Sequence, residues 1–300
     1  MSAAGSGRLR SVRWRGFGAV LDPDWRVRLS ASAARPVRLE QRRTADDRVR
    51  VGDARAVSST ASAAVAHYGE RMPPAEPLTA LHRRIHESAA EAVRAGRPAV
   101  DPVPVDGDAR WGLSLVALPD ADTRAALQAA AAGLASTTAN PHVAYDAGDL
   151  HMTVRSLEGF ADEVPEAVID RYCERLTSAL RGVGPLTVRF EGMFLTSTGV
   201  VACGHPDPVL PLARERLAAD AAAHGWNQVR GGDAARIRDT AHVSLMVFRD
   251  AAARDDRLVD HVEASHGTAL GTMTVDRLAL VTYTVSGDGV KLHRRGWVPL

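Results

Sequence analysis

The sequence lacks the features that mark a membrane protein, a secreted protein or a metalloprotein. No apolar run approaches the roughly 18 residues of a membrane-spanning helix, and the basic N-terminus lacks the apolar core of a signal peptide. The two cysteines, Cys173 and Cys203, form no CxxC pair and no metal-ligand spacing. We therefore expect a cytoplasmic protein with no disulfide, metal, cofactor or membrane partner.

Several catalytic signatures are missing as well. The chain has no Gly-rich phosphate loop, no nucleophile elbow and no dinucleotide fingerprint. His82 and His86 have the i, i+4 spacing of helical metal ligands, but the zinc-protease pattern requires Glu after the first histidine, where this chain has Arg83. We interpret the pair as part of a solvated helix face.

The net charge of +1 conceals a basic N-terminal arm. Residues 1–55 hold 13 Arg against six Asp and Glu, a net charge of +7, so the rest of the chain carries −6. A basic arm can contact nucleic acid or remain a solvated, poorly ordered or partly helical extension. A later native start is a third alternative, because regular patterning begins near Pro77. We interpret residues 1–75 as a flexible extension.

The rest of the chain divides into a helix with a linker and a regular α+β region. Residues 76–109 contain an amphipathic helix and a Pro/Gly-rich stretch. Residues 110–300 predict the order β-α-β-α-β-β and then α-β-α-β-β, ending in strands over 272–285 and 290–300. This repeated order favours a bilobed α+β fold, with two pseudo-symmetric lobes of antiparallel sheet around a central cleft.

Two short apolar runs each carry a histidine, one spacer and a hydroxyl residue. They are "DLHMTVRSL" over residues 149–157 and "TAHVSLMVF" over residues 240–248, one in each half of the repeated order. Two further His-x-Ser/Thr tripeptides begin at His86 and His266, in a helical pattern and at a helix end. Because only the first two lie in strand-like runs, we interpret them as a functional pair.

Alternation along a strand places residues two apart on one face. One face would hold His151, Thr153 and Arg155, and the other His242 and Ser244. If the two faces meet, two imidazoles and two hydroxyls converge on one cleft. One imidazole can accept a proton while the other donates one near neutral pH, and the hydroxyls can bind phosphate oxygens.

These runs resemble the paired motifs of the 2H phosphoesterase superfamily, which includes 2′,5′ RNA ligase and cyclic nucleotide phosphodiesterase proteins. "HMTVRSLEG" is similar to the first motif and "TAHVSLMVF" to the second, with Ser where many relatives have Thr. The resemblance covers residues 110–300 and implies a bilobed fold. It also implies His151 and His242 as acid and base, and Thr153 and Ser244 as phosphate ligands.

Other side chains near these runs have two interpretations each. Arg155 is a further candidate for binding phosphate. Arg236 and Arg238, just before the second run, either reach a phosphate or lie on the surface. Tyr283 and Trp297, in the last predicted strands, either stack on a base or pack in the core.

The resemblance implies a metal-independent phosphodiesterase that opens 2′,3′-cyclic phosphates of RNA ends or nucleotides, with reversible 2′,5′ RNA ligation through the same groups. Its partner would be an RNA end or a cyclic nucleotide, and a monomer is the default state. Two alternatives stay open, a non-catalytic RNA- or nucleotide-binding module of the same fold and a hydrolase of a small-metabolite phosphodiester. The intact pair of histidines favours an enzyme, because a binding module does not need both imidazoles.

Overall fold

The computed structural model describes residues 78–105, 111–157, 164–226, 238–249 and 254–300. The extension predicted over residues 1–75 lies outside these ranges. All described residues belong to one compact unit of the chain, Gly52–Leu300. Among the helices in the described ranges, none has the length and hydropathy that a membrane crossing requires.

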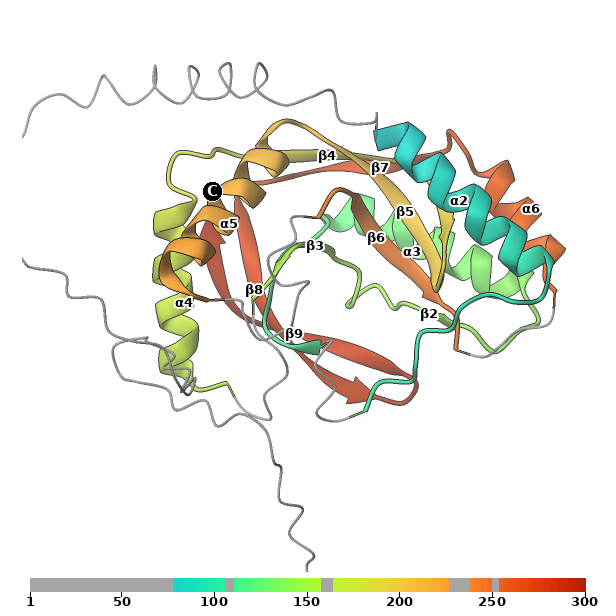
Figure 1. The fold of residues 1–300 in the computed structure, drawn as a ribbon, viewed down its shortest axis with the longest axis horizontal. Coiled ribbons are helices and arrows are strands. Elements are labelled where there is room, and N and C mark those ends of the chain that lie inside the picture. Colours follow the sequence, from blue (N-terminus) through green and yellow to red (C-terminus); the bar gives the residue numbers. More distant parts are fainter. Residues whose placement is uncertain (1–77, 106–110, 158–163, 227–237, 250–253) are drawn as a thin grey trace, which may run out of the picture. The chain divides into compact units, whose positions relative to one another are not determined.

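A single sheet organises the described residues. Its strands are β1 (Ser114–Ala117), β2 (Val143–Ala144), β3 (Met152–Ser156), β4 (Leu186–Thr196), β5 (Gly199–Pro206), β6 (Ala241–Val247), β7 (Ala269–Val275), β8 (Arg277–Ser286) and β9 (Gly289–Pro299). Their order is β7-β4-β5-β6-β3-β1-β8-β9, with β2 paired to β6 beside this path. The paired strands are antiparallel, and the sheet is strongly curled (Figure 1).

The helices begin where the sequence offers a suitable first turn. They are α2 (Leu78–Arg94), α3 (Ala121–Thr137), α4 (Glu166–Ala179), α5 (Val209–His224) and α6 (Asp256–Ala264). The Asp120 carboxylate accepts from Thr123 N at 2.9 Å, and Asp255 accepts from Leu258 N at 3.0 Å. Each carboxylate thereby satisfies a backbone N–H that has no partner within its own helix.

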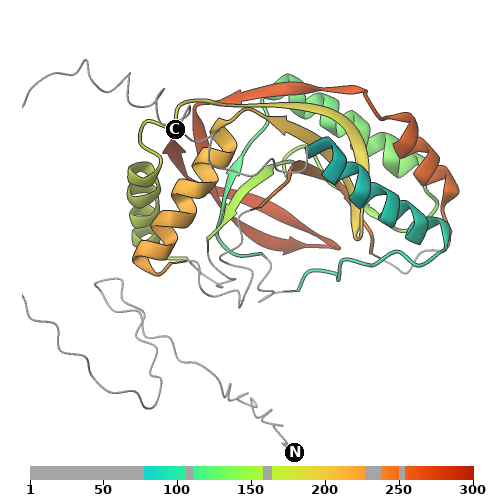
Figure 2. The same cartoon turned by 45° about the horizontal axis from the view of Figure 1, so that its top comes forward.

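The sheet has two similar halves, which confirms the bilobed α+β prediction. One half contains β7, β4, β5 and β6, and α3 packs on β6 and β7 while α6 packs on β4. The other contains β3, β1, β8 and β9, and α4 packs on β9 while α5 packs on β3. Figure 2 shows α4 and α5 together at one end of the sheet and α3 and α6 at the other. The halves join where β3 pairs with β6.

Each half takes strands from both parts of the chain. The hairpin β4–β5 follows β3 in sequence but lies beside β6, whereas β8–β9 follows β6 but lies on the side of β3. The single strand predicted over 272–285 is wrong, because the chain separates it at Asp276 into β7, which pairs with β4, and β8, which pairs with β1. Apolar residues stand on both sides of Asp276 and Arg277 with no Gly or Pro between them, so the sequence pattern does not reveal this crossing between halves.

Helix α2 is packed against the sheet, and the predicted solvated face for its histidines is wrong. His82 is 3% exposed and His86 is 4% exposed, on the face that α2 turns toward β4 and α6. β7 pairs with β4 only as far as Glu191, and beyond that point Leu195 N donates to His86 Nδ1 at 3.2 Å. The helix therefore covers part of a strand edge that would otherwise expose unpaired backbone groups.

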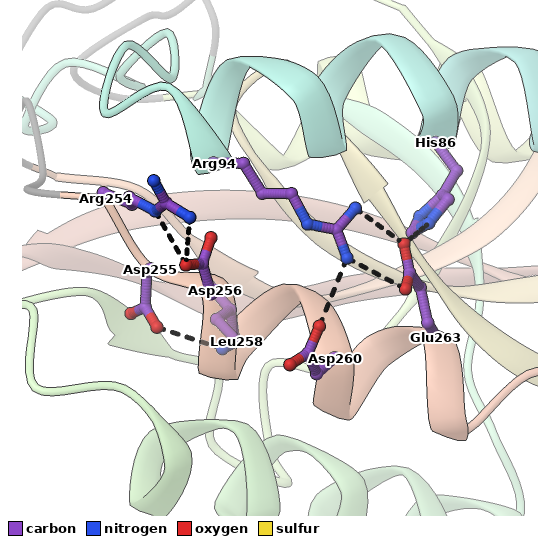
Figure 3. A network of polar contacts seen from close by, with 8 residues as sticks. All are labelled: His86, Arg94, Arg254, Asp255, Asp256, Leu258, Asp260 and Glu263. Carbon is purple, nitrogen blue, oxygen red and sulfur yellow. Dashed lines mark hydrogen bonds and ion pairs between the residues drawn. The ribbon is translucent and has the colours of Figure 1, made fainter.

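An ion-pair network fixes α2 to α6 (Figure 3). The Arg94 guanidinium donates two hydrogen bonds of 3.0 Å to Glu263 and one of 3.2 Å to Asp260. His86 Nε2 lies 3.6 Å from a Glu263 oxygen. Exposed pairs of this kind contribute about 1 kcal/mol or less, so the buried histidine face of α2 contributes more to docking than this network does.

Candidate functional site

The two histidine runs meet at the junction of the two halves. Met152 of β3 pairs with Val243 of β6 in antiparallel register, and both are fully buried. The same register, extended by one residue in each direction, sets each histidine opposite the hydroxyl residue of the other strand, His151 opposite Ser244 and Thr153 opposite His242. Directly opposed side chains share a face of the sheet. These four partly exposed side chains therefore lie on one face, opposite the face that holds Met152 and Val243.

His151 is held in one orientation by two hydrogen bonds. Its Nδ1 lies 2.7 Å from the carbonyl oxygen of Asp149, and its Nε2 lies 3.2 Å from the hydroxyl of Tyr283. The carbonyl only accepts, so Nδ1 carries the proton and Nε2 is left with a lone pair. Burial lowers the pKa of His151, against the opposing effect of the Asp149 carbonyl. The resting imidazole is therefore neutral, with a proton-accepting Nε2.

The Asp149 backbone is itself fixed by β9. Its carboxylate is buried, and it accepts from Lys291 Nζ at 2.8 Å and from Leu292 N at 3.0 Å. These contacts hold the chain immediately before β3. Strand β9, from the far end of the sequence, thus holds in place the carbonyl group that orients His151.

His242 has a different environment. Its Nδ1 lies 3.1 Å from the hydroxyl of Thr240. Burial, together with the positive charges of Arg238 and Arg214, lowers the pKa of His242 to about 4. The effects of His82 and His151 act in the same direction. His242 is therefore also neutral near pH 7, and the charge around it is positive and suited to an anion.

A buried thiol–imidazole pair lies beside His242. Cys203 of β5 is the cross-strand partner of His242, and its Sγ contacts Nδ1 of His82 from α2. Burial raises the pKa of Cys203 to about 12 and lowers that of His82 to about 4. Both groups are thus uncharged near pH 7, and the thiol donates to the imidazole. Helix α2 therefore packs beside the site. The sequence predicted this helix over residues 76–109 but gave no sign that it contacts the histidine strands.

Arg155 does not reach this face. Val116 of β1 pairs with Thr153, whereas the adjacent Leu115 pairs with Arg155, so β3 contains a β-bulge. Leu115 and Val116 are neighbours on β1, so their side chains point to opposite faces of the sheet. Their partners Arg155 and Thr153 therefore point to opposite faces as well. Arg155 is 6% exposed, and its guanidinium lies 5.6 Å from the ring centre of Trp226. The prediction that Arg155 shares the histidine face is wrong, because one extra residue reverses the alternation.

Tyr283 and Trp297 pack against an apolar cluster of β1, β8 and β9, as the core interpretation predicts. Tyr283 is 7% exposed, yet its hydroxyl contacts His151. Two guanidinium groups lie close to the ring centre of Trp297, that of Arg277 at 4.3 Å and that of Arg294 at 4.6 Å. The sequence reveals no signal for the Tyr283–His151 contact, because 132 residues separate the two positions.

The two arginines before the second run have different outcomes. Arg236 lies outside the described residues. The charge of Arg238 lowers the pKa of both His151 and His242. In the described part of the chain, no group of three His, Cys, Asp or Glu side chains is arranged to hold a metal ion.

Comparisons with known proteins find similar solved structures. No protein-family model and no curated protein matches the chain. The similar structures include TT0787 of Thermus thermophilus (20% identity, TM-score 0.44), a phosphoesterase (15%, 0.45) and Escherichia coli LigT in complex with 3′-AMP (17%, 0.46). Each match covers 63% of this chain and 97% or 98% of the solved one.

Proposed function

We propose that this face is the active site of a metal-independent phosphodiesterase that opens 2′,3′-cyclic phosphates of RNA ends or nucleotides. One observation carries the proposal, which is the register that sets each histidine opposite the other strand's hydroxyl residue. Two proton-transfer groups and two hydroxyl donors then lie on neighbouring strands about 5 Å apart. A phosphate placed between them has a hydroxyl and an imidazole on each side.

The reaction that this geometry supports is an in-line hydrolysis. One imidazole accepts a proton from water as the water oxygen bonds to phosphorus. The other donates its proton to the ribose oxygen as the phosphorus–oxygen bond of the ring breaks. The hydroxyls of Thr153 and Ser244 donate to the non-bridging oxygens and hold the phosphorus in line. The product is a phosphomonoester, and by microscopic reversibility the same groups can form a 2′,5′ RNA linkage with a ribose hydroxyl in place of water.

The protonation of the site depends on the substrate. Burial and positive charge lower the pKa of both His151 and His242, so both are neutral in the empty site near pH 7. An anionic phosphate stabilises a protonated imidazole beside it. Substrate binding therefore raises the pKa of the imidazole, which takes up from solvent the proton that the general acid requires.

The test is hydrolysis of 2′,3′-cyclic mononucleotides, RNA with a cyclic-phosphate end and ADP-ribose cyclic phosphate, with EDTA present. We expect turnover by the native chain, and a loss of about 10²- to 10⁴-fold in His151→Ala and His242→Ala. His266→Ala is the matched control, because this histidine begins another His-x-Thr tripeptide but stacks on Phe194, at 4.7 Å between ring centres.

The outcomes separate the proposal from its alternatives. Full turnover by both His151→Ala and His242→Ala would exclude this site. Inactivity of the native chain on every substrate, with tight binding of the nucleotides, would identify a binding module instead. Circular dichroism of each variant checks that the loss of turnover does not result from unfolding.

A further inference from the structure

Arg214 is a buried charge at the junction of the two halves. It lies on α5, and its side chain is among the few charged ones that are buried, at 5% exposure. Its guanidinium donates to the carbonyl oxygens of Thr153 at 3.1 Å, Val154 at 3.4 Å and Arg238 at 2.9 Å. Burial lowers the pKa of Arg214 to about 10, and the charge of Asp239 acts against this effect. Burying a guanidinium is costly, so the backbone contacts that satisfy its N–H donors define its role.

The three carbonyl groups belong to two separate strands of the site. Thr153 supplies one of the two hydroxyls, and Val154 lies at the bulge where β3 changes its register against β1. Arg238 lies two residues before Thr240, whose hydroxyl contacts His242. One rigid planar group thus connects the first histidine strand to the segment that leads into the second.

The connection is placed where the sheet itself is weakest. β3 and β6 share the single registered pair Met152–Val243, whereas β5 and β6 are paired from Gly199 to Gly204. Backbone hydrogen bonds alone therefore leave the spacing of the two histidine strands poorly fixed. The guanidinium of Arg214 supplies the missing connection from the helix side of the sheet.

We propose that Arg214 is a positioning residue that sets the distance and orientation between the two histidine–hydroxyl pairs. This inference rests on the proposed phosphodiesterase site, and Arg214 acts through the backbone without touching the substrate. Its charge has a second effect, since the positive guanidinium lowers the pKa of His242. Geometry and charge can be separated, because Lys retains the charge but cannot donate in the fork geometry of Arg.

The experiment compares Arg214→Lys and Arg214→Met with Arg216→Lys. Arg216 is the matched control, because it lies on the same helix and donates to a carbonyl, that of Arg181 at 2.7 Å, away from the site. The assay is hydrolysis of a 2′,3′-cyclic mononucleotide across pH. We expect kcat to fall about 10²-fold in Arg214→Met, which is the loss that a misplacement of about 1 Å causes. In Arg214→Lys, which retains part of the contact, we expect kcat to fall about tenfold. KM should change less than kcat. The pH limb governed by His242 should move to higher pH in Arg214→Met alone.

Two readouts make the inference refutable. Unchanged kcat in the folded fraction of both Arg214 variants, with only a lower unfolding midpoint, would reduce Arg214 to a structural residue. Histidine NMR titration of the same variants requires no substrate, so it still applies if the native chain does not hydrolyse cyclic phosphates. A pKa of His242 that is the same in Arg214→Met and the native chain would overturn the charge effect. If Arg214→Met does not fold, Arg214→Lys carries the kinetic test.

Discussion

Acidification should unfold this protein partly through His82, and the effect can be calculated. Burial lowers the pKa of His82 to about 4 in the folded chain, against about 6.5 in an unfolded one. The unfolded chain therefore binds more protons below pH 6.5, so the free energy of unfolding decreases as the pH falls from 6.5 toward 4. For a group with these two pKa values, the loss between pH 7 and pH 5 is about 2 kcal/mol.

Replacing His82 by Gln should remove that part of the pH dependence. Urea unfolding of the native chain and of His82→Gln at pH 7 and pH 5 gives four free energies of unfolding. The native chain should lose about 2 kcal/mol more than the variant on acidification, whatever the variant loses at pH 7 from its missing contact with Cys203. His293→Gln is the control, because this histidine is exposed on β9.

An equal loss in the native chain and in His82→Gln would refute the reasoning. It would mean that His82 is not kept neutral by the fold, and hence that α2 does not bury it against β5 in solution. A loss in the variant that exceeds the loss in the native chain would reverse the predicted sign. In both cases the description of α2 as packed beside the site would have to be given up.

Three further predictions follow from the site. Tyr283→Phe removes the hydroxyl that contacts His151 and should lower the free energy of unfolding by about 1 kcal/mol; an unchanged urea midpoint would contradict this contact. Arg155→Met should keep turnover near the native rate but lower stability, because its guanidinium lies over Trp226; a large rise in KM would restore Arg155 as a phosphate ligand. Binding of sulfate, which does not itself titrate near pH 6, should take up protons at that pH, because both histidines are neutral before it binds. Titration calorimetry in buffers of different ionisation enthalpy measures that uptake, and an uptake of zero would argue against the substrate-assisted protonation.

The sequence by itself determined most of the elements, including the two strands that carry the histidine runs. Alternation in "HMTV" and "AHVSL" identified two strands, each with a polar and a buried face, because side-chain direction along a regular strand is a local property. The repeated order of elements predicted two similar halves, but not that each half takes its hairpin from the other part of the chain. Capping by Asp120 and the proline-led starts of α4 and α5 are local as well.

Tertiary structure alone decided which strands became neighbours and what surrounds the histidines. The register of β3 on β6, the crossing at Asp276 and the bulge that turns Arg155 away depend on partners distant in the sequence. His82 of α2, Tyr283 of β8 and Arg214 of α5 come to the site for the same reason. No local pattern can record such contacts, because their free energy arises only when surfaces far apart along the chain exclude water together.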